Sequence, residues 1–126
     1  MRVELPSKQA DGTQNWVDLK NLDDLLGEDL LIINRAARIT QAAGGETSFA
    51  PRELEDDRAN AFLGRVITAW SFPVPVPAQN SMAAADVVIG RAMRARDYAA
   101  LRKAVRPLLD ELDGLERQDP KSSPPG

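Results

Sequence analysis

The stretch ELEDDRANAFLGRVITAWSFPVPVP, residues 53–77, decides how this chain folds. It opens with acidic residues, which suit the positive end of a helix dipole, and continues with apolar residues at helical spacing. That apolar stripe consists of Ala59, Phe62, Leu63, Val66, Ile67 and Trp70. The helix must end before Pro73, because a proline fixes its own φ and disfavours the helical region for the preceding residue. We therefore expect a buried helix followed by an extended, proline-rich strap.

The strap, residues 70–77, carries the apolar side chains of Trp70, Phe72, Val74 and Val76. If the backbone is extended here, Val74 and Val76 point to one side and the prolines to the other. Because prolines lack an amide donor, such a segment can pair only at a sheet edge or lie unpaired over a surface. Two interpretations stay open: the strap covers the domain's own core, or it is a preformed apolar strip that meets a partner.

Residues 2–20 have the pattern of a short β-hairpin. Apolar and polar residues alternate on either side of a turn in which Gly12 supplies the positive φ that a tight connection requires. A two-stranded hairpin is marginally stable by itself. We therefore expect it to pack against helices through Trp16 or Leu19, with Trp16 as an anchor in the core.

A further helix is predicted over residues 28–41, after Asn21, a residue type that caps helix starts. Leu30, Ile33 and Ala37 share one face of this helix. The apolar band is broad, as expected for a helix at the centre of the core or one that lies partly at an interface.

Two more helices are predicted after the strap. The first covers residues 82–90, with Gly90 as a weak point or an end. The second begins at about Arg94 and has an apolar seam at Tyr98, Leu101, Val105, Leu108, Leu112 and Leu115. Pro107 should kink this helix or split it in two. The seam faces either the core or another helix in an oligomer.

These patterns predict a mainly α fold: a small helical domain of about four helices with a short N-terminal β-hairpin and an extended proline-rich strap. The domain covers residues 1–118, since 126 residues suffice for one modest core. Residues 119–126, DPKSSPPG, have the composition of a disordered tail.

The composition argues against several kinds of site. The chain contains no cysteine and no histidine, so thiolate nucleophiles, the commonest general base and the commonest transition-metal ligand are absent. The acids at residues 53–57 fit a solvated helix start better than a metal site. We expect no catalytic residues, no cofactor, no metal and no enzyme activity. We also expect no membrane span, because no apolar run approaches the roughly 20 residues required, and no signal peptide.

Charge is segregated along the last predicted helix. Basic residues at Arg91, Arg94, Arg96, Arg102, Lys103 and Arg106 precede acidic ones at Asp110, Glu111, Asp113, Glu116 and Asp119. The basic group could contact phosphates, neutralise acids such as residues 53–57, face another subunit, or remain solvated. A formal net charge of -3 argues against nucleic acid as a general partner.

Three segments in this order resemble the small tail assembly chaperones of long-tailed actinobacterial phages. They are NWVDL at residues 15–19, FLGRVITAWSFPVPVP at residues 62–77 and RDYAALRKAVRPLLDEL at residues 96–112. The similarity covers most of the chain. The sequence departs from the family pattern over residues 82–92, where a short acidic loop is more usual.

The resemblance implies a non-enzymatic assembly role in the host cytoplasm. Such chaperones bind the tape measure protein, keep it soluble and pass it to the subunits of the tail tube. The implied partners are therefore the tape measure protein and the major tail tube protein. The apolar seam of the last predicted helix adds a homo-oligomer as a further possibility. Many members of the family are also made in a longer form by a programmed ribosomal frameshift.

Partner binding is expected at the apolar strap, with charge complementarity from the basic helix face. The residues concerned are Trp70, Phe72, Val74 and Val76, together with Arg94, Arg102 and Arg106. Two other functions remain open. One is a structural head–tail or tail-terminator component of the virion, and the other is a nucleic-acid-associated regulator that uses basic residues 91–106.

Overall fold

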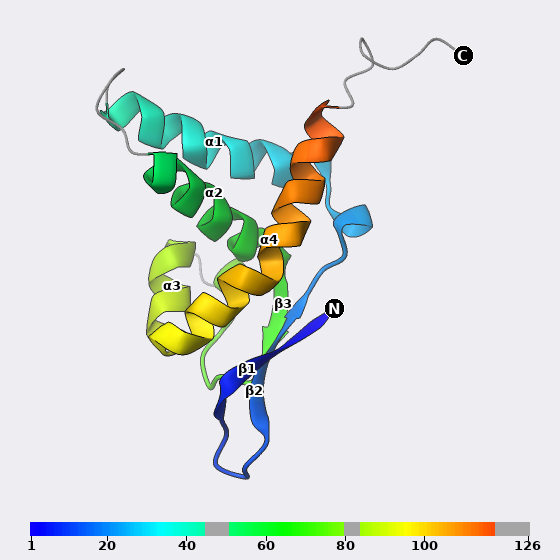
Figure 1. Ribbon diagram of the computed structural model, residues 1–126, viewed down its shortest axis with the longest axis vertical. Helices are drawn as coiled ribbons and strands as arrows, with labels where there is room; N and C mark the ends of the chain where they lie inside the picture. Colours follow the sequence, from blue (N-terminus) through cyan, green and yellow to red (C-terminus); the bar gives the residue numbers. More distant parts are fainter. Residues whose placement is uncertain (45–50, 80–83, 118–126) are drawn as a thin grey trace.

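The computed structural model describes residues 1–44, 51–79 and 84–117 (Figure 1). In order, the chain forms β1 (Arg2–Lys8), β2 (Gln14–Leu19), α1 (Gly27–Gly44), α2 (Pro51–Val66), β3 (Ile67–Trp70), α3 (Ala85–Ala92) and α4 (Ala95–Arg117). Two 3-10 turns, η1 (Leu22–Asp24) and η2 (Pro77–Gln79), lie between them. The described part of the chain is thus mainly α-helical, as predicted. The expected tail, residues 119–126, lies outside the described residues.

The predicted N-terminal hairpin is confirmed, and it belongs to a three-stranded antiparallel sheet in the order β1-β2-β3. Arg2 pairs with Asp18 and Glu4 with Trp16, and the turn places Gly12 at a φ of 90°. The Asp11 carboxylate accepts the amide hydrogen of Thr13 at 2.9 Å, which fixes the turn. The tip of the hairpin projects away from the helices (Figure 1).

The third strand, β3, corrects the prediction that the helix continues to Trp70. Helix α2 ends at Val66, and Ile67–Trp70 pairs with β2, with Val17 opposite Trp70 and Leu19 opposite Ile67. Ile67 and Thr68 are β-branched and so fit a strand better than a helix. The pairing also covers an edge of β2 that would otherwise present unpaired backbone groups.

The apolar stripe of residues 53–77 is buried as predicted, although its last part is strand. Ala59, Phe62, Leu63, Val66, Ile67 and Trp70 all lie in the core. The sheet contributes Leu5, Val17 and Leu19, and the other helices contribute Ile33, Ile89, Leu101, Val105 and Leu112. One face of the sheet therefore packs against the helices, and the other is open to solvent.

Trp16 lies on the solvent side of the sheet and is not the expected core anchor. Val17, the next residue along the strand, is buried, and so is Leu19. Successive side chains of a strand point to opposite faces, so Trp16 faces outward when Val17 faces the core. The guanidinium of Arg2 lies 3.9 Å from its ring centroid, and Leu19 supplies the contact with the helices.

Helix α1 begins at Gly27 without the expected cap from Asn21, which instead precedes η1 and makes no capping hydrogen bond. Asp29, in the first turn, accepts the amide hydrogen of Leu26 at 2.9 Å. This is one half of a capping box, in which an acid at the third helical position satisfies the amide before the helix. Helices α1 and α2 then lie side by side (Figure 1).

Helix α4 crosses α2 and packs against β1 (Figure 1). The expected split at Pro107 does not occur, since α4 is continuous from Ala95 to Arg117. Pro107 and Lys103 are both exposed, so water can hydrate the Lys103 carbonyl that has lost its helical donor. The seam mostly faces the core, as one interpretation proposed; Leu115, at its end, is exposed.

Helices α2 and α3 approach closely at Gly64. A Cβ atom at this position would lie 2.7 Å from the Cβ of Ala85, a distance that side chains do not tolerate. Helix α3 continues past Gly90, where the sequence had suggested a weak point. None of the helices in the described ranges is long and apolar enough to cross a lipid bilayer.

Candidate functional site

The proline-rich segment after β3 is bent, and the expected extended strap is not seen. The buried indole of Trp70 donates a hydrogen bond of 2.7 Å to the carbonyl of Val74, which turns the chain back on itself. Buried indoles usually find such an acceptor. Val76 is only 5% exposed and Val74 is 45% exposed, so the two valines do not share a face as predicted.

The four strap residues therefore divide between core and surface. Trp70 and Val76 are part of the domain's own core. Phe72 is half-buried and packs edge-on against Trp70, with ring centroids 5.6 Å apart. Val74 is the most exposed of the four, although more than half of its surface is still covered. The interpretation that the strap covers the core thus holds for Trp70 and Val76, whereas Phe72 and Val74 remain accessible.

Phe72 and Arg94, two of the predicted site residues, line the same groove between the hairpin and the junction of α3 with α4. The groove has a volume of about 520 Å³. We call it the basic groove, and its lining residues are Ser7, Lys8, Asn15, Phe72, Arg91, Ala92, Met93, Arg94 and Asp97. Four separate parts of the chain meet there: the hairpin, the bend after β3, and the ends of α3 and α4.

A network of polar side chains holds these parts in place. The buried Asp97 accepts two hydrogen bonds from Ser7, one from its amide at 2.9 Å and one from its hydroxyl at 2.6 Å. Asn15 donates to the Ser7 hydroxyl at 2.7 Å and accepts from the Ser71 hydroxyl at 2.8 Å. Ser71 in turn accepts the amide hydrogen of Trp16 at 2.9 Å. Since every link joins different elements, the network fixes the shape of the groove.

The groove is positively charged although the chain as a whole is negative. Lys8, Arg91 and Arg94 are exposed, and none of them forms an ion pair with another described residue. Asp97 is the one acid among the lining residues, and both its carboxylate oxygens already accept hydrogen bonds. Cations that have no ion-pair partner in the described ranges, and that lie beside an aromatic ring, suit a ligand that combines carboxylates with an apolar side chain.

The other two predicted arginines lie elsewhere on α4. Arg102 forms an ion pair of 2.8 Å with Asp56 and donates to the Tyr98 hydroxyl at 2.9 Å. Burial lowers the pKa of Arg102, but these two partners outweigh it and raise the pKa above its ordinary value. The expectation that the basic group neutralises residues 53–57 is thus confirmed for Arg102. Arg106 lies with Arg102 in a smaller hollow of about 250 Å³.

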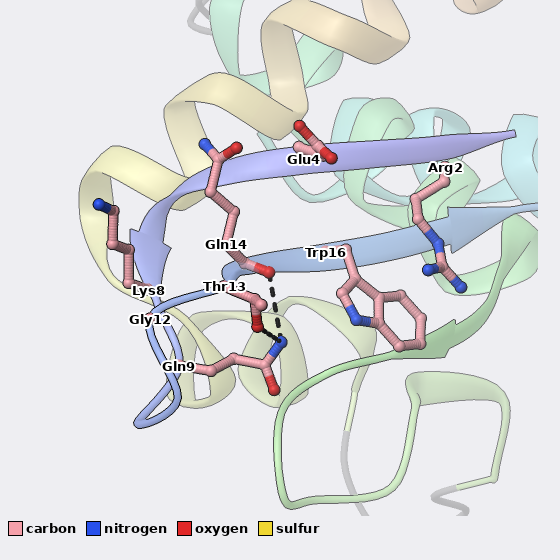
Figure 2. Close-up of a pocket in the computed structure, with 8 residues that line it drawn as sticks. All are labelled: Arg2, Glu4, Lys8, Gln9, Gly12, Thr13, Gln14 and Trp16. Atoms are coloured by element: carbon pink, nitrogen blue, oxygen red, sulfur yellow. Dashed lines mark hydrogen bonds between the residues drawn. The ribbon is translucent and has the colours of Figure 1, made fainter.

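A second hollow lies on the outer face of the hairpin (Figure 2). It has a volume of about 790 Å³ and includes Arg2, Glu4, Lys8 and Trp16. Figure 2 shows Arg2 beside the Trp16 ring at one end and Lys8 at the other. Arg2 is also held by Asp18 at 2.7 Å, and this hydrogen bond lowers the pKa of the Asp18 carboxyl. Because Arg2 already covers the ring and pairs with an acid, this face has less to offer a charged partner than the basic groove.

Sequence reasoning missed Lys8, Ser7, Asn15 and Asp97 as groove residues. Ser7 and Asp97 are 90 positions apart, and no local pattern links them. Among the described residues, no three acidic side chains are grouped to hold a metal ion.

Comparison with known proteins adds no family, since no protein-family model matches this chain and searches of curated proteins and of solved structures find no similar one.

Proposed function

We propose that this protein is a phage tail assembly chaperone that binds the tape measure protein, keeps it soluble in the host cytoplasm and promotes assembly of the tail tube. The three segments that resemble this family support the proposal. They form β2, the end of α2 with β3 and the following bend, and most of α4. These elements pack against one another in the core, so the resemblance concerns the residues that specify the fold.

The observation that carries the proposal is the basic groove with its accessible aromatic ring. A chaperone must recognise apolar client segments without exposing so much apolar surface that it aggregates itself. Phe72 and the edge of Met93 offer limited apolar area, and Lys8, Arg91 and Arg94 surround it with charge. The proposed client segment has an apolar residue flanked by carboxylates, which the cations select by charge.

Co-expression with the tape measure protein tests this function. The wild-type chain should keep that protein in the soluble fraction, and the double variant R91E/R94E should fail to do so while it remains folded by circular dichroism. The matched control is R96E/K103E, which makes the same change in net charge at exposed residues outside the groove lining. If the tape measure protein is equally insoluble with and without the wild-type chain, the proposed function is wrong.

The same variants separate the chaperone from the other functions considered. A nucleic-acid regulator would bind DNA with an affinity that falls steeply with salt and would be impaired by both double variants. A structural component of the virion would be found in purified particles. The chaperone should be absent from the particles and should bind little DNA at physiological salt.

A further inference from the structure

The outer face of α1 carries an exposed apolar pair framed by opposite charges. Leu31 is 61% exposed and Ile32 is 36% exposed. The Glu28 side chain is 68% exposed, and Arg35 is also exposed. At about 100° per residue these four side chains fall within an arc of about 100° on the helix surface. We call them the α1 stripe.

The α1 stripe lies opposite the face with which α1 contacts the rest of the protein. Asp29 and Ile33 are buried, and Leu30 packs against the core. Leu31 and Ile32 belong neither to the core cluster nor to the partly buried residues that pack against it. Large apolar side chains that are adjacent, exposed and framed by charged residues are typical of interaction surfaces.

The order of residues along the stripe makes it complementary to itself. An axis through the midpoint of Leu31 and Ile32 is equally far from Glu28 and Arg35. A second copy placed antiparallel about this axis would set Glu28 of each chain opposite Arg35 of the other, and Leu31 opposite Ile32. A parallel arrangement would oppose like charges at both ends, which is unfavourable.

We propose that the α1 stripe is the contact of a two-fold symmetric dimer in which the α1 helices of two copies pack antiparallel. This interface is isologous, with the same residues contributed by both copies. Its apolar centre supplies the burial energy, and the two Glu28–Arg35 pairs set the direction. The proposal does not depend on the chaperone function.

Two features of the structure define the strength of this contact. The stripe is small compared with the interface of an obligate dimer, so the dimer should dissociate on dilution. Glu28 lies 3.5 Å from Arg65, but Arg65 is held more closely by Asp29 at 2.7 Å. Glu28 is therefore able to turn toward a partner without leaving Arg65 unpaired.

Analytical ultracentrifugation of the full chain tests the proposal, with variants that reverse the charge at Glu28 or at Arg35. The wild type should shift toward dimer with rising concentration. In a dimer of E28R, arginine lies opposite arginine at both ends of the stripe, and in a dimer of R35E glutamate lies opposite glutamate. Each variant alone should therefore dimerise about tenfold more weakly than the wild type. An equimolar mixture of E28R and R35E should regain the dimer, because every cation then faces an anion. R96E serves as the control that alters charge away from the stripe.

Loss of the apolar pair provides an independent measurement. L31S/I32S should be monomeric with an unchanged free energy of unfolding, whereas V87S, at an exposed apolar residue on α3, should dimerise like the wild type. The proposal is overturned if the wild type stays monomeric up to about 1 mM, the weak end of specific association. It is also overturned if a dimer forms that neither charge variant weakens.

Discussion

Asp97 offers the most direct test of how the basic groove is built, through its replacement by alanine. This residue is 1% exposed, and its carboxylate accepts hydrogen bonds from both the amide and the hydroxyl of Ser7. Those two contacts attach β1 to the first turn of α4, across 90 positions of sequence. D97A removes both acceptors and leaves the Ser7 amide without a protein partner.

The expected cost follows from the number of hydrogen bonds lost. A hydrogen bond to a charged group contributes about 1.5–3 kcal/mol, so the loss of two should lower the free energy of unfolding of D97A by about 3–6 kcal/mol. D97N keeps the shape and one carbonyl acceptor, and should cost about 1–2 kcal/mol. Since small domains are stable by only about 5–15 kcal/mol, D97A should bring this protein close to unfolding at room temperature.

Urea unfolding of D97N, S7A and the double variant measures the contact itself. The Ser7 hydroxyl bonds both Asp97 and Asn15, so S7A alone should cost about 1–2 kcal/mol. The two changes should be coupled by about 1 kcal/mol, because each removes the same hydroxyl–carboxylate bond. Additive effects, or a D97A chain as stable as the wild type, would refute the network.

Substitutions at three further places probe other parts of the fold. G64A should cost about 1–3 kcal/mol through the clash of α2 with α3, and the added change A85G should recover part of the loss. V76S should destabilise the domain by more than 1 kcal/mol, whereas V74S should change stability by about 0.5 kcal/mol or less, because only Val76 is buried. D29N should lower stability at pH 7 and weaken its dependence on acid pH, as measured by urea unfolding at a series of pH values.

The sign of the acid effect follows from the contacts of Asp29. Burial would raise the pKa of this carboxyl, but the Leu26 amide and the Arg65 guanidinium more than offset it, so the pKa lies below its ordinary value. The stabilisation is therefore complete above the unfolded pKa of about 4 and is lost as the pH falls through the folded pKa. The wild type should lose more stability than D29N between pH 5 and pH 3 or so.

Each of these changes has an outcome that contradicts its reasoning. A G64A chain that is as stable as the wild type would mean that α2 and α3 do not approach as described. Equal effects of V74S and V76S would contradict the bend after β3. Parallel pH profiles for D29N and the wild type would show that Asp29 makes no contribution that depends on its charge.

Local sequence patterns predicted the elements that form because of residues close together in the sequence. Gly12 and the alternation around it identified the hairpin, and the regular seam of α4 identified a helix, although the seam did not show whether this helix faces the core or another subunit. Strand β3 was missed because Ile67 and Trp70 continue the helical spacing of α2. Residues 67–70 form a strand because they pair with β2, which lies some 50 positions earlier in the chain.

The site depended even more on contacts between distant residues. The bend after β3 arises because the buried Trp70 indole needs an acceptor and finds the Val74 carbonyl. The prolines alone suggested an extended strap, since they restrict φ without fixing the direction of the chain. Arg94 and Phe72 were both expected to bind a partner, but sequence could not show that Lys8 and Asp97 join them in one groove.

The central claim, that the basic groove receives an acidic segment with an apolar residue, is tested most directly by nuclear magnetic resonance. A soluble fragment of the tape measure protein would be titrated into the isotopically labelled full chain at two salt concentrations. The largest changes in amide chemical shift should occur at Lys8, Asn15, Ala92 and Met93, should weaken at high salt, and should vanish in R91E/R94E. Binding that leaves these amides unchanged would contradict the account.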